Sequence, residues 1–182
     1  MSLEPSFAPD GKRLVFETRV RGETARGRIT MLDLASMHYD DLTSAQDDCR
    51  QPNWSPRGDT ILYQKRVGSR WHIWLYDVTR KTHRLATATG DGDKTDASFS
   101  PDGRFIVYSG EFGDQEGEYL LAVPLTGGQP FRITRHAGYH GAASWSPDGS
   151  YLVQEASEHT SRRGPSSTQL IVTPVQLKLA MP

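Results

Sequence analysis

Short apolar runs separated by polar, turn-forming stretches recur along the whole chain. The clearest runs lie at positions 14–16, 61–63, 105–108 and 151–153. Runs of this length bounded by Gly, Pro, Asn and Asp are typical of β-strands. Some strands are apolar on both faces, which favours sheets stacked face to face. No stretch of about ten residues has the apolar spacing of a helix, so the pattern predicts an all-β protein.

One block of sequence occurs four times. Each copy has an aromatic residue, a turn containing proline and glycine, and then one of the apolar runs. The copies begin at Pro5, Pro52, Ala97 and Ala143. Their turn prolines are Pro9, Pro56, Pro101 and Pro147, and the successive spacings between them are 47, 45 and 46 residues. A period near 45 residues corresponds to one four-stranded propeller blade.

The turn of each copy is predicted to join two strands as a hairpin. Proline presets φ, aspartate accepts a hydrogen bond from the backbone downstream, and glycine adopts the positive φ that closes the turn. The residues concerned are Asp10, Asp102 and Asp148 with Gly11, Gly58, Gly103 and Gly149. The second copy has Arg57 at the aspartate position, so we expect its turn to lose the side-chain bond and keep the glycine.

The aromatic residue beside each turn is a candidate for the blade core. These residues are Phe7, Trp54, Phe99 and Trp145. A stacking platform for bases or sugars is the alternative, but their fixed place beside the hairpin favours packing inside the blade.

Two further strands are predicted in each copy. The third strands are expected at 28–34, 72–78, 119–125 and 169–173, and the fourth strands at 39–43, 82–87 and 129–134. The last copy has only residues 175–180 for its fourth strand, directly after Pro174, which cannot donate to a strand ladder. The prediction is one propeller domain, residues 1–182, with blades at about 4–43, 51–87, 96–134 and 142–180.

The repeated block resembles the TolB-type β-propeller repeat. The matching segments are 7–11, 54–58, 99–103 and 145–149, followed by Leu-Asp or Tyr-Asp strand ends at 32–33 and 76–77 and by Leu-Thr or Ile-Thr pairs at 42–43 and 133–134. Such repeats occur in the periplasmic TolB of the Tol-Pal system, in prolyl-oligopeptidase-like and tricorn-like proteases, in oligogalacturonate lyase-like enzymes and in some transcriptional regulators. The resemblance therefore implies the fold and leaves the activity open.

The number of blades in the finished ring also stays open. TolB-type rings usually have six or more blades, whereas this chain has four repeats. Four blades can close a small ring, form half of a ring completed by a second chain, or be part of a larger propeller. An open arc leaves two apolar blade faces exposed, and such faces are association surfaces. A homodimer through these faces is one of the alternatives.

Composition and charge argue against several classes of protein. With 21 Lys plus Arg against 22 Asp plus Glu, the formal net charge is -1, which gives no global attraction to nucleic acid or an anionic membrane. No apolar run of about 18 residues predicts a membrane span, and no signal segment follows Met1. Only the resemblance points to the periplasm. The lone Cys49 is a metal ligand, a reactive thiol near Arg50, or simply a small residue.

Candidate binding residues gather in the blade-to-blade connections. These connections lead into the innermost strands and so approach one mouth of the channel. The residues are Asp47, Asp48, Asp91, Asp93, Asp96, His136 and His140. Carboxylates in a concave mouth attract a cation or the basic group of a peptide, and oxygen with imidazole ligands suits a divalent metal ion such as Mn or Zn. Solvated loops that bind nothing have the same polar composition.

Catalytic motifs are largely missing from the sequence. It has no Gly-x-Ser-x-Gly, no His-Glu-x-x-His, no Gly-rich phosphate loop and no dinucleotide fingerprint. We therefore expect a non-catalytic module for protein–protein interaction or ligand recognition, with a protein or peptide partner and no cofactor unless a divalent cation occupies the channel mouth. The alternatives are a metal-assisted carbohydrate-active or hydrolytic enzyme, with Asp93, Asp96, His136 and His140 as its cluster, and the propeller domain of a prolyl-oligopeptidase-like protease.

Overall fold

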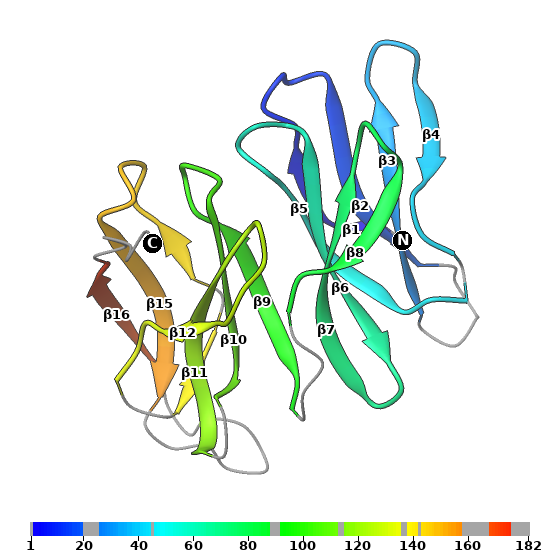
Figure 1. Ribbon diagram of the computed structural model, residues 1–182. Helices are drawn as coiled ribbons and strands as arrows, with labels where there is room; N and C mark the ends of the chain where they lie inside the picture. The colour runs from blue at the N-terminus through cyan, green and yellow to red at the C-terminus, as the bar shows by residue number, and fades with distance from the viewer. Residues whose placement is uncertain are drawn as a thin grey trace.

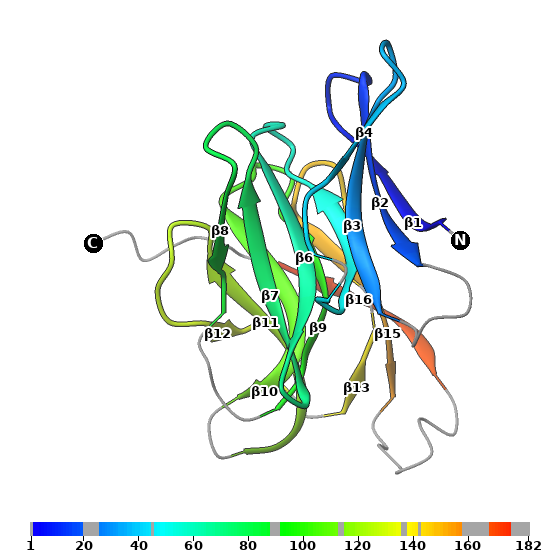
Figure 2. The ribbon, with the colours of Figure 1, turned by 90° about the vertical axis from the view of Figure 1, so that its right-hand side faces the viewer.

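All regular structure in the described part of the chain is β. The computed structural model describes residues 2–19, 26–44, 46–87, 92–112, 115–135, 138–141, 143–157 and 168–175. Its strands form four antiparallel sheets, one for each sequence repeat. Figure 1 shows these sheets, blades 1 to 4, side by side in chain order from right to left, and Figure 2 turns the arc by 90°. The predicted all-β propeller architecture is confirmed.

Neighbouring strands in the sequence are neighbours in each of the first three sheets. Blade 1 contains β1 (Ser2–Phe7), β2 (Arg13–Arg19), β3 (Gly27–Asp33) and β4 (His38–Asp41). Blade 2 contains β5 (Cys49–Trp54), β6 (Thr60–Val67), β7 (Arg70–Asp77) and β8 (Thr82–Leu85). Blade 3 contains β9 (Lys94–Phe99), β10 (Phe105–Phe112), β11 (Gln115–Pro124) and β12 (Phe131–Arg132).

The fourth sheet departs from this plan. It contains β13 (Tyr139–His140), β14 (Ser144–Trp145), β15 (Tyr151–Ser157) and β16 (Gln169–Pro174). Both β13 and β14 pair with the same edge of β15, so together they take the place of one inner strand. The fourth strand expected within 175–180 falls largely on residues 176–180, which lie outside the described residues.

The hairpin turns form as the sequence predicts. Their glycines have φ between 65° and 73°. The backbone N–H two residues downstream donates to Asp10, Asp102 and Asp148 at 2.8, 3.0 and 3.1 Å. Arg57 makes no such bond, but its guanidinium Nη2 donates to the backbone oxygen of Asp102 in the next turn at 3.3 Å. The second copy thus replaces a bond within its turn by a bond between turns.

The hydrophobic core lies between the blades. At the first junction, Val15 and Ile29 of blade 1 pack against Ile61, Tyr63 and Tyr76 of blade 2. At the second, blade 2 contributes Leu62, Ile73 and Leu75. At the third, blade 3 contributes Val107, Leu120 and Ala122. Successive residues of a strand therefore pack into opposite junctions, because side chains alternate between the two faces of a β-sheet.

Each blade thus has two different faces. We call the side that faces the preceding blade the leading face, represented in blade 2 by Ile61, Tyr63 and Tyr76. The side that faces the following blade is the trailing face, represented there by Leu62 and Ile73. Every internal junction joins a trailing face to a leading face.

The expectation that the four repeat aromatics lie in the blade core is wrong for one of them. Trp54 and Phe99 are buried, and Trp145 is half-buried against the third junction, but Phe7 is 64% exposed. Phe7 pairs with Leu14 across β1 and β2, which places it on the leading face of blade 1. The described residues include no blade before it, so this face stays open.

Candidate functional site

The inner strands β1, β5 and β9 share a β-bulge at the same repeat position. The ladder register of each strand shifts there. Each bulge contains one non-glycine residue in the left-handed region: Glu4 with φ 51°, Gln51 with φ 50° and Asp96 with φ 53°. Such a conformation costs on the order of 1 kcal/mol or more. Bulges redirect side chains, so this recurrence gives three blades a polar side chain outside the regular ladder.

These three residues line a cavity of about 320 Å³ along the inner strands. All four blades contribute to its wall. The lining residues are Glu4, Pro5, Ser6, Gln51, Pro52, Asn53, Asp96, Ala97, Ser98 and Ala143. Because the innermost strands of a propeller surround its central channel, we call this surface the channel wall.

Hydrogen bonds join the bulge residues from blade to blade. The backbone N–H of Gln51 donates to Glu4 Oε2 at 3.0 Å. Its side-chain Nε2 donates to Asp96 Oδ1 at 3.3 Å. The buried Gln51 Oε1 has no hydrogen-bond partner among the described residues. The wall therefore has two carboxylates that accept hydrogen bonds from Gln51, and one amide oxygen that could accept a further hydrogen bond.

A group of carboxylates on blades 3 and 4 extends the negative charge of the wall. Burial raises the pKa of Glu118 above its ordinary value, and the charges of Asp96, Asp93 and Glu111 raise it further. Burial also raises the pKa of Tyr139, with a contribution from Asp96 and neighbouring glutamates. These shifts place the carboxylates within electrostatic reach of one another. A positive group bound here would relieve their repulsion.

Asp47 and Asp48 do not line this wall. Asp47 forms an ion pair with Lys65 at 2.9 Å. Asp48 accepts a hydrogen bond from the backbone N–H of Gly27 at 3.2 Å and pairs with Arg50 at 3.3 Å. Both carboxylates thus stabilise the connection between blades 1 and 2 through ion pairs with Lys65 and Arg50.

The other predicted residues have different positions. Asp96 lies on the channel wall, and Asp93 accepts a hydrogen bond from the backbone N–H of Trp71 at 2.8 Å. His140 is buried, with its Nδ1 3.3 Å from Gln154 Nε2. Asp91 and His136 lie outside the described residues. The structure therefore associates Asp93 and Asp96 with the acidic group but does not bring the whole predicted set together.

The described residues contain no group of three or more His, Cys, Asp or Glu side chains placed to hold one metal ion. The predicted metal cluster comprises Asp93, Asp96, His136 and His140, of which His136 lies outside the described residues. His140 is buried beside Gln154, and Asp93 accepts a hydrogen bond from the backbone of blade 2. Cys49 is also unsuited to ligation, because burial raises the pKa of its thiol to about 12. The side chains that the structure describes here fit a hydrogen-bonding cation better than a metal ion.

Sequence reasoning missed Glu4 and Gln51, and it did not include Glu118 among the candidate residues. One signal was present: Glu4, Gln51 and Asp96 stand directly before the aligned starts of the first three copies. Positive φ at a non-glycine residue has no strong local signature. Only the repeat alignment could have marked these positions as equivalent.

Comparisons with known proteins agree with the propeller fold. The family model described as the TolB beta propeller domain matches residues 1–148. The chain is 27% identical to the uncharacterized peptidase YuxL of Bacillus subtilis over 157 residues, which is 85% of this chain and 22% of the relative. It is 31% identical to the Tol-Pal system protein TolB of Francisella tularensis over 88 residues, which is 48% of this chain and 20% of the relative.

Solved structures show the same fold at low sequence identity. TolB from Acinetobacter baumannii aligns with a TM-score of 0.75 and 20% identity, covering 94% of this chain and 40% of that chain. Oligogalacturonate lyase in complex with manganese aligns with a TM-score of 0.70 and 15% identity, covering 97% and 49%. The chain spans about a fifth of the length of the two curated relatives. Among the described residues, no helix is long and apolar enough to cross a membrane.

Proposed function

Because this chain belongs to the TolB beta propeller domain family, we propose that it is a non-catalytic recognition module that binds a basic segment of a protein or peptide partner at its acidic channel wall. A relative in the family is named as a component of the Tol-Pal system, which is consistent with a role in protein assembly. The peptide backbone and side chains of a partner can both use the hydrogen-bond acceptors of the wall.

One observation carries this proposal: the continuous row of acceptors formed by Glu4, Gln51 and Asp96. Carboxylates accept strong, charge-assisted hydrogen bonds from Arg and Lys. The buried Gln51 Oε1 adds an acceptor that has no partner among the described residues, and an unmade buried hydrogen bond favours a ligand that supplies a donor. A guanidinium group, with five N–H donors in a plane, matches such a row better than a single metal ion does.

The test is titration calorimetry with a capped peptide of alternating Arg and Gly residues. The control peptide has Gln in place of each Arg. We expect the Arg peptide to bind, with an affinity that falls as salt rises, and the Gln peptide to bind much more weakly. Asp96→Asn should lower the affinity about tenfold, the equivalent of about 1.4 kcal/mol.

A matched variant separates the wall from general charge effects. Asp40→Asn removes one exposed carboxylate on the outer strand β4 and should leave peptide affinity within about twofold of the parent protein. Equal binding of the two peptides, or equal losses in Asp96→Asn and Asp40→Asn, would rule out recognition by the wall.

A second candidate is the propeller domain of a peptidase, supported by the similarity to YuxL over most of this chain. In that case the channel wall would contact peptide substrates of a catalytic domain, and affinity would depend on free peptide termini more than on basic side chains. Comparing capped and uncapped versions of both peptides distinguishes the two functions.

A metal-assisted enzyme is the remaining alternative. Its support is the fold of the manganese-containing lyase. Titration with MnCl₂ tests it directly: stoichiometric binding that is lost in Asp93→Asn would favour this alternative over a peptide-binding wall. We expect no such binding, because the described side chains form no three-ligand group.

A further inference from the structure

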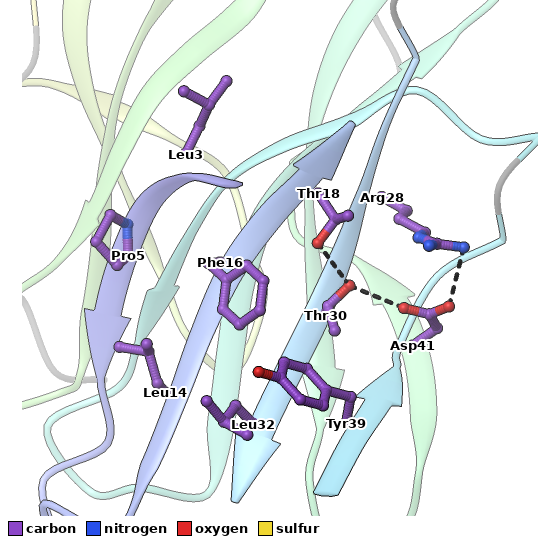
Figure 3. A pocket seen from close by; sticks show the side chains of 10 residues that line it. All are labelled: Leu3, Pro5, Leu14, Phe16, Thr18, Arg28, Thr30, Leu32, Tyr39 and Asp41. Atoms are coloured by element: carbon purple, nitrogen blue, oxygen red, sulfur yellow. Dashed lines mark hydrogen bonds and ion pairs between the residues drawn. The ribbon is translucent and has the colours of Figure 1, made fainter. Parts of the chain in front are cut away.

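The leading face of blade 1 is a hollow, partly apolar surface at one end of the arc. Its cavity has a volume of about 530 Å³. The lining residues, drawn in Figure 3, are Leu3, Pro5, Leu14, Phe16, Thr18, Arg28, Thr30, Leu32, Tyr39 and Asp41. No blade in the described part of the chain packs against this side of the sheet.

The same face is covered in blade 2. Phe16 and Tyr39 meet edge to face with ring centroids 6.4 Å apart. Tyr63 and His83 hold the equivalent positions in blade 2 and meet in the same way at 5.9 Å. The outer members of the two pairs, Tyr39 and His83, are both exposed. The cover shows at the inner strand: Trp54 of blade 2 is 5% exposed beneath blade 1, whereas its equivalent Phe7 is 64% exposed. Blade 1 therefore carries an uncovered aromatic residue at a position that the first internal junction buries in blade 2.

The surface that covers blade 2 is the trailing face of blade 1, and its counterpart in blade 4 is exposed. By strand register, Val15, Ile29 and Met31 in blade 1 correspond to Val153, Leu170 and Val172 in blade 4. The three blade 1 residues lie in the first junction. Leu170 and Val172, in contrast, are 78% and 62% exposed. The arc thus ends in one uncovered leading face and one uncovered trailing face.

Polar groups on the two end faces are complementary as well. Arg28 pairs with Asp41 at 3.0 Å through Nη1, while its buried Nε has no partner among the described residues. Glu155 on the trailing face of blade 4 occupies the repeat position of Glu17 in blade 1. Glu17 lies beside Gly27 and the backbone oxygen of Cys49, whose ladder row in blade 2 continues through Lys65 to the counterpart of Arg28, His72. A trailing face docked in the same register would place Glu155 on the ladder row of blade 1 that ends at Arg28.

We propose that the leading face of blade 1 binds the trailing face of blade 4 of a second copy of this chain. The partner surface is the one that all three internal junctions already use, and the contact runs head to tail. Such a contact closes a ring when the rotation permits and forms an open chain when it does not. Two copies supply eight blades, which is within the range of known propellers.

The test is light scattering coupled to size exclusion over a range of protein concentrations. We expect a dimer of about 40 kDa or, if the contact forms open chains, a ladder of multiples of the 20.3 kDa monomer, in exchange with that monomer. Leu170→Asp on the trailing face and Tyr39→Lys on the leading face should each abolish it. Both side chains are exposed in the single chain, so folding, checked by circular dichroism, should be retained. Val67→Asp changes an exposed residue in the hairpin between β6 and β7 and should have no effect.

Mixing the two interface variants tests the polarity of the contact. Leu170→Asp retains a normal leading face and Tyr39→Lys retains a normal trailing face, so an equimolar mixture should recover a dimer of one copy of each. A monomer at every concentration would overturn the proposal. A dimer that resists both variants, or that the mixture fails to restore, would overturn it too.

Discussion

The side-chain nitrogen of Gln51 in blade 2 donates a hydrogen bond to Asp96 Oδ1 in blade 3, at 3.3 Å. Both residues lie at the same bulge of their inner strands and both have positive φ. The bond therefore links two equivalent strained positions of neighbouring repeats. It also fixes the position of Asp96 beside the other acidic residues. Because the charge of Asp96 raises the pKa of Glu118, a group that binds at the wall would change proton binding by Glu118.

We expect a basic peptide to release protons when it binds at about pH 5. The pKa of Glu118 is raised by burial and by Asp96, Asp93 and Glu111, and a bound guanidinium would lower it again, so the protonated fraction falls. Calorimetry in buffers of different ionisation enthalpy measures this release. Glu118→Gln should remove most of it, while Asp40→Asn on the outer strand serves as the comparison; undiminished release in Glu118→Gln would show that another group is the source.

The turn of blade 4 should weaken in acid. Hydrogen bonds from Ser146 and Ser150 lower the pKa of Asp148 from its ordinary value of 3.8 to about 2. Because the folded pKa is the lower one, ionised Asp148 stabilises the turn above about pH 4, and this contribution disappears as the pH falls toward about 2. Urea unfolding at several pH values measures the effect. The acid-induced decline should be smaller in Asp148→Asn, and identical declines in the two proteins would contradict this assignment.

Truncation at two equivalent trailing positions should have very different effects on folding. Ile29 is fully buried at the first junction, so Ile29→Ala should lower the free energy of unfolding by about 2–5 kcal/mol. Leu170→Ala, measured at concentrations where the chain is monomeric, should change it by no more than about 0.5 kcal/mol. Similar losses at both sites would mean that blade 4 is covered within the monomer.

The thiol of Cys49 should be unreactive in the folded protein. It lies fully buried in the first junction, and burial raises its pKa to about 12. Because the thiolate is the reactive form, alkylation by iodoacetamide at about pH 8 should be at least about 100-fold slower than in urea. Mass spectrometry of timed samples gives both rates. Rapid labelling without urea would restore the interpretation of Cys49 as a reactive residue.

The turns could be predicted because their determinants are local. Gly11 supplies the positive φ and Asp10 accepts a backbone hydrogen bond within the same few residues. All four copies keep the glycine and three keep the aspartate. Phe7 could not be predicted, because its exposure depends on whether another blade lies before blade 1. Arg57 shows the same limit: its bond to Asp102 crosses 45 residues of sequence.

The candidate site was only partly predictable for a related reason. The sequence indicates which loops approach the channel, and Asp96 is found there. It does not indicate which acids are neutralised by their neighbours, as Asp47 is by Lys65. Nor does it show that Glu4 and Gln51 leave the strand ladder, since that follows from a bulge whose backbone angles have no strong local signal.

The shared bulge separates the chemistry of the channel wall from the stability of the blade. Glu4, Gln51 and Asp96 differ in charge and length, yet their backbones adopt the same left-handed conformation at the same repeat position. The residues that pack the junctions occupy other positions on the strands. Evolution or design can therefore change the side chains at these few places, and with them the charge of the channel wall, provided that each replacement tolerates positive φ, as Asn and Gly do.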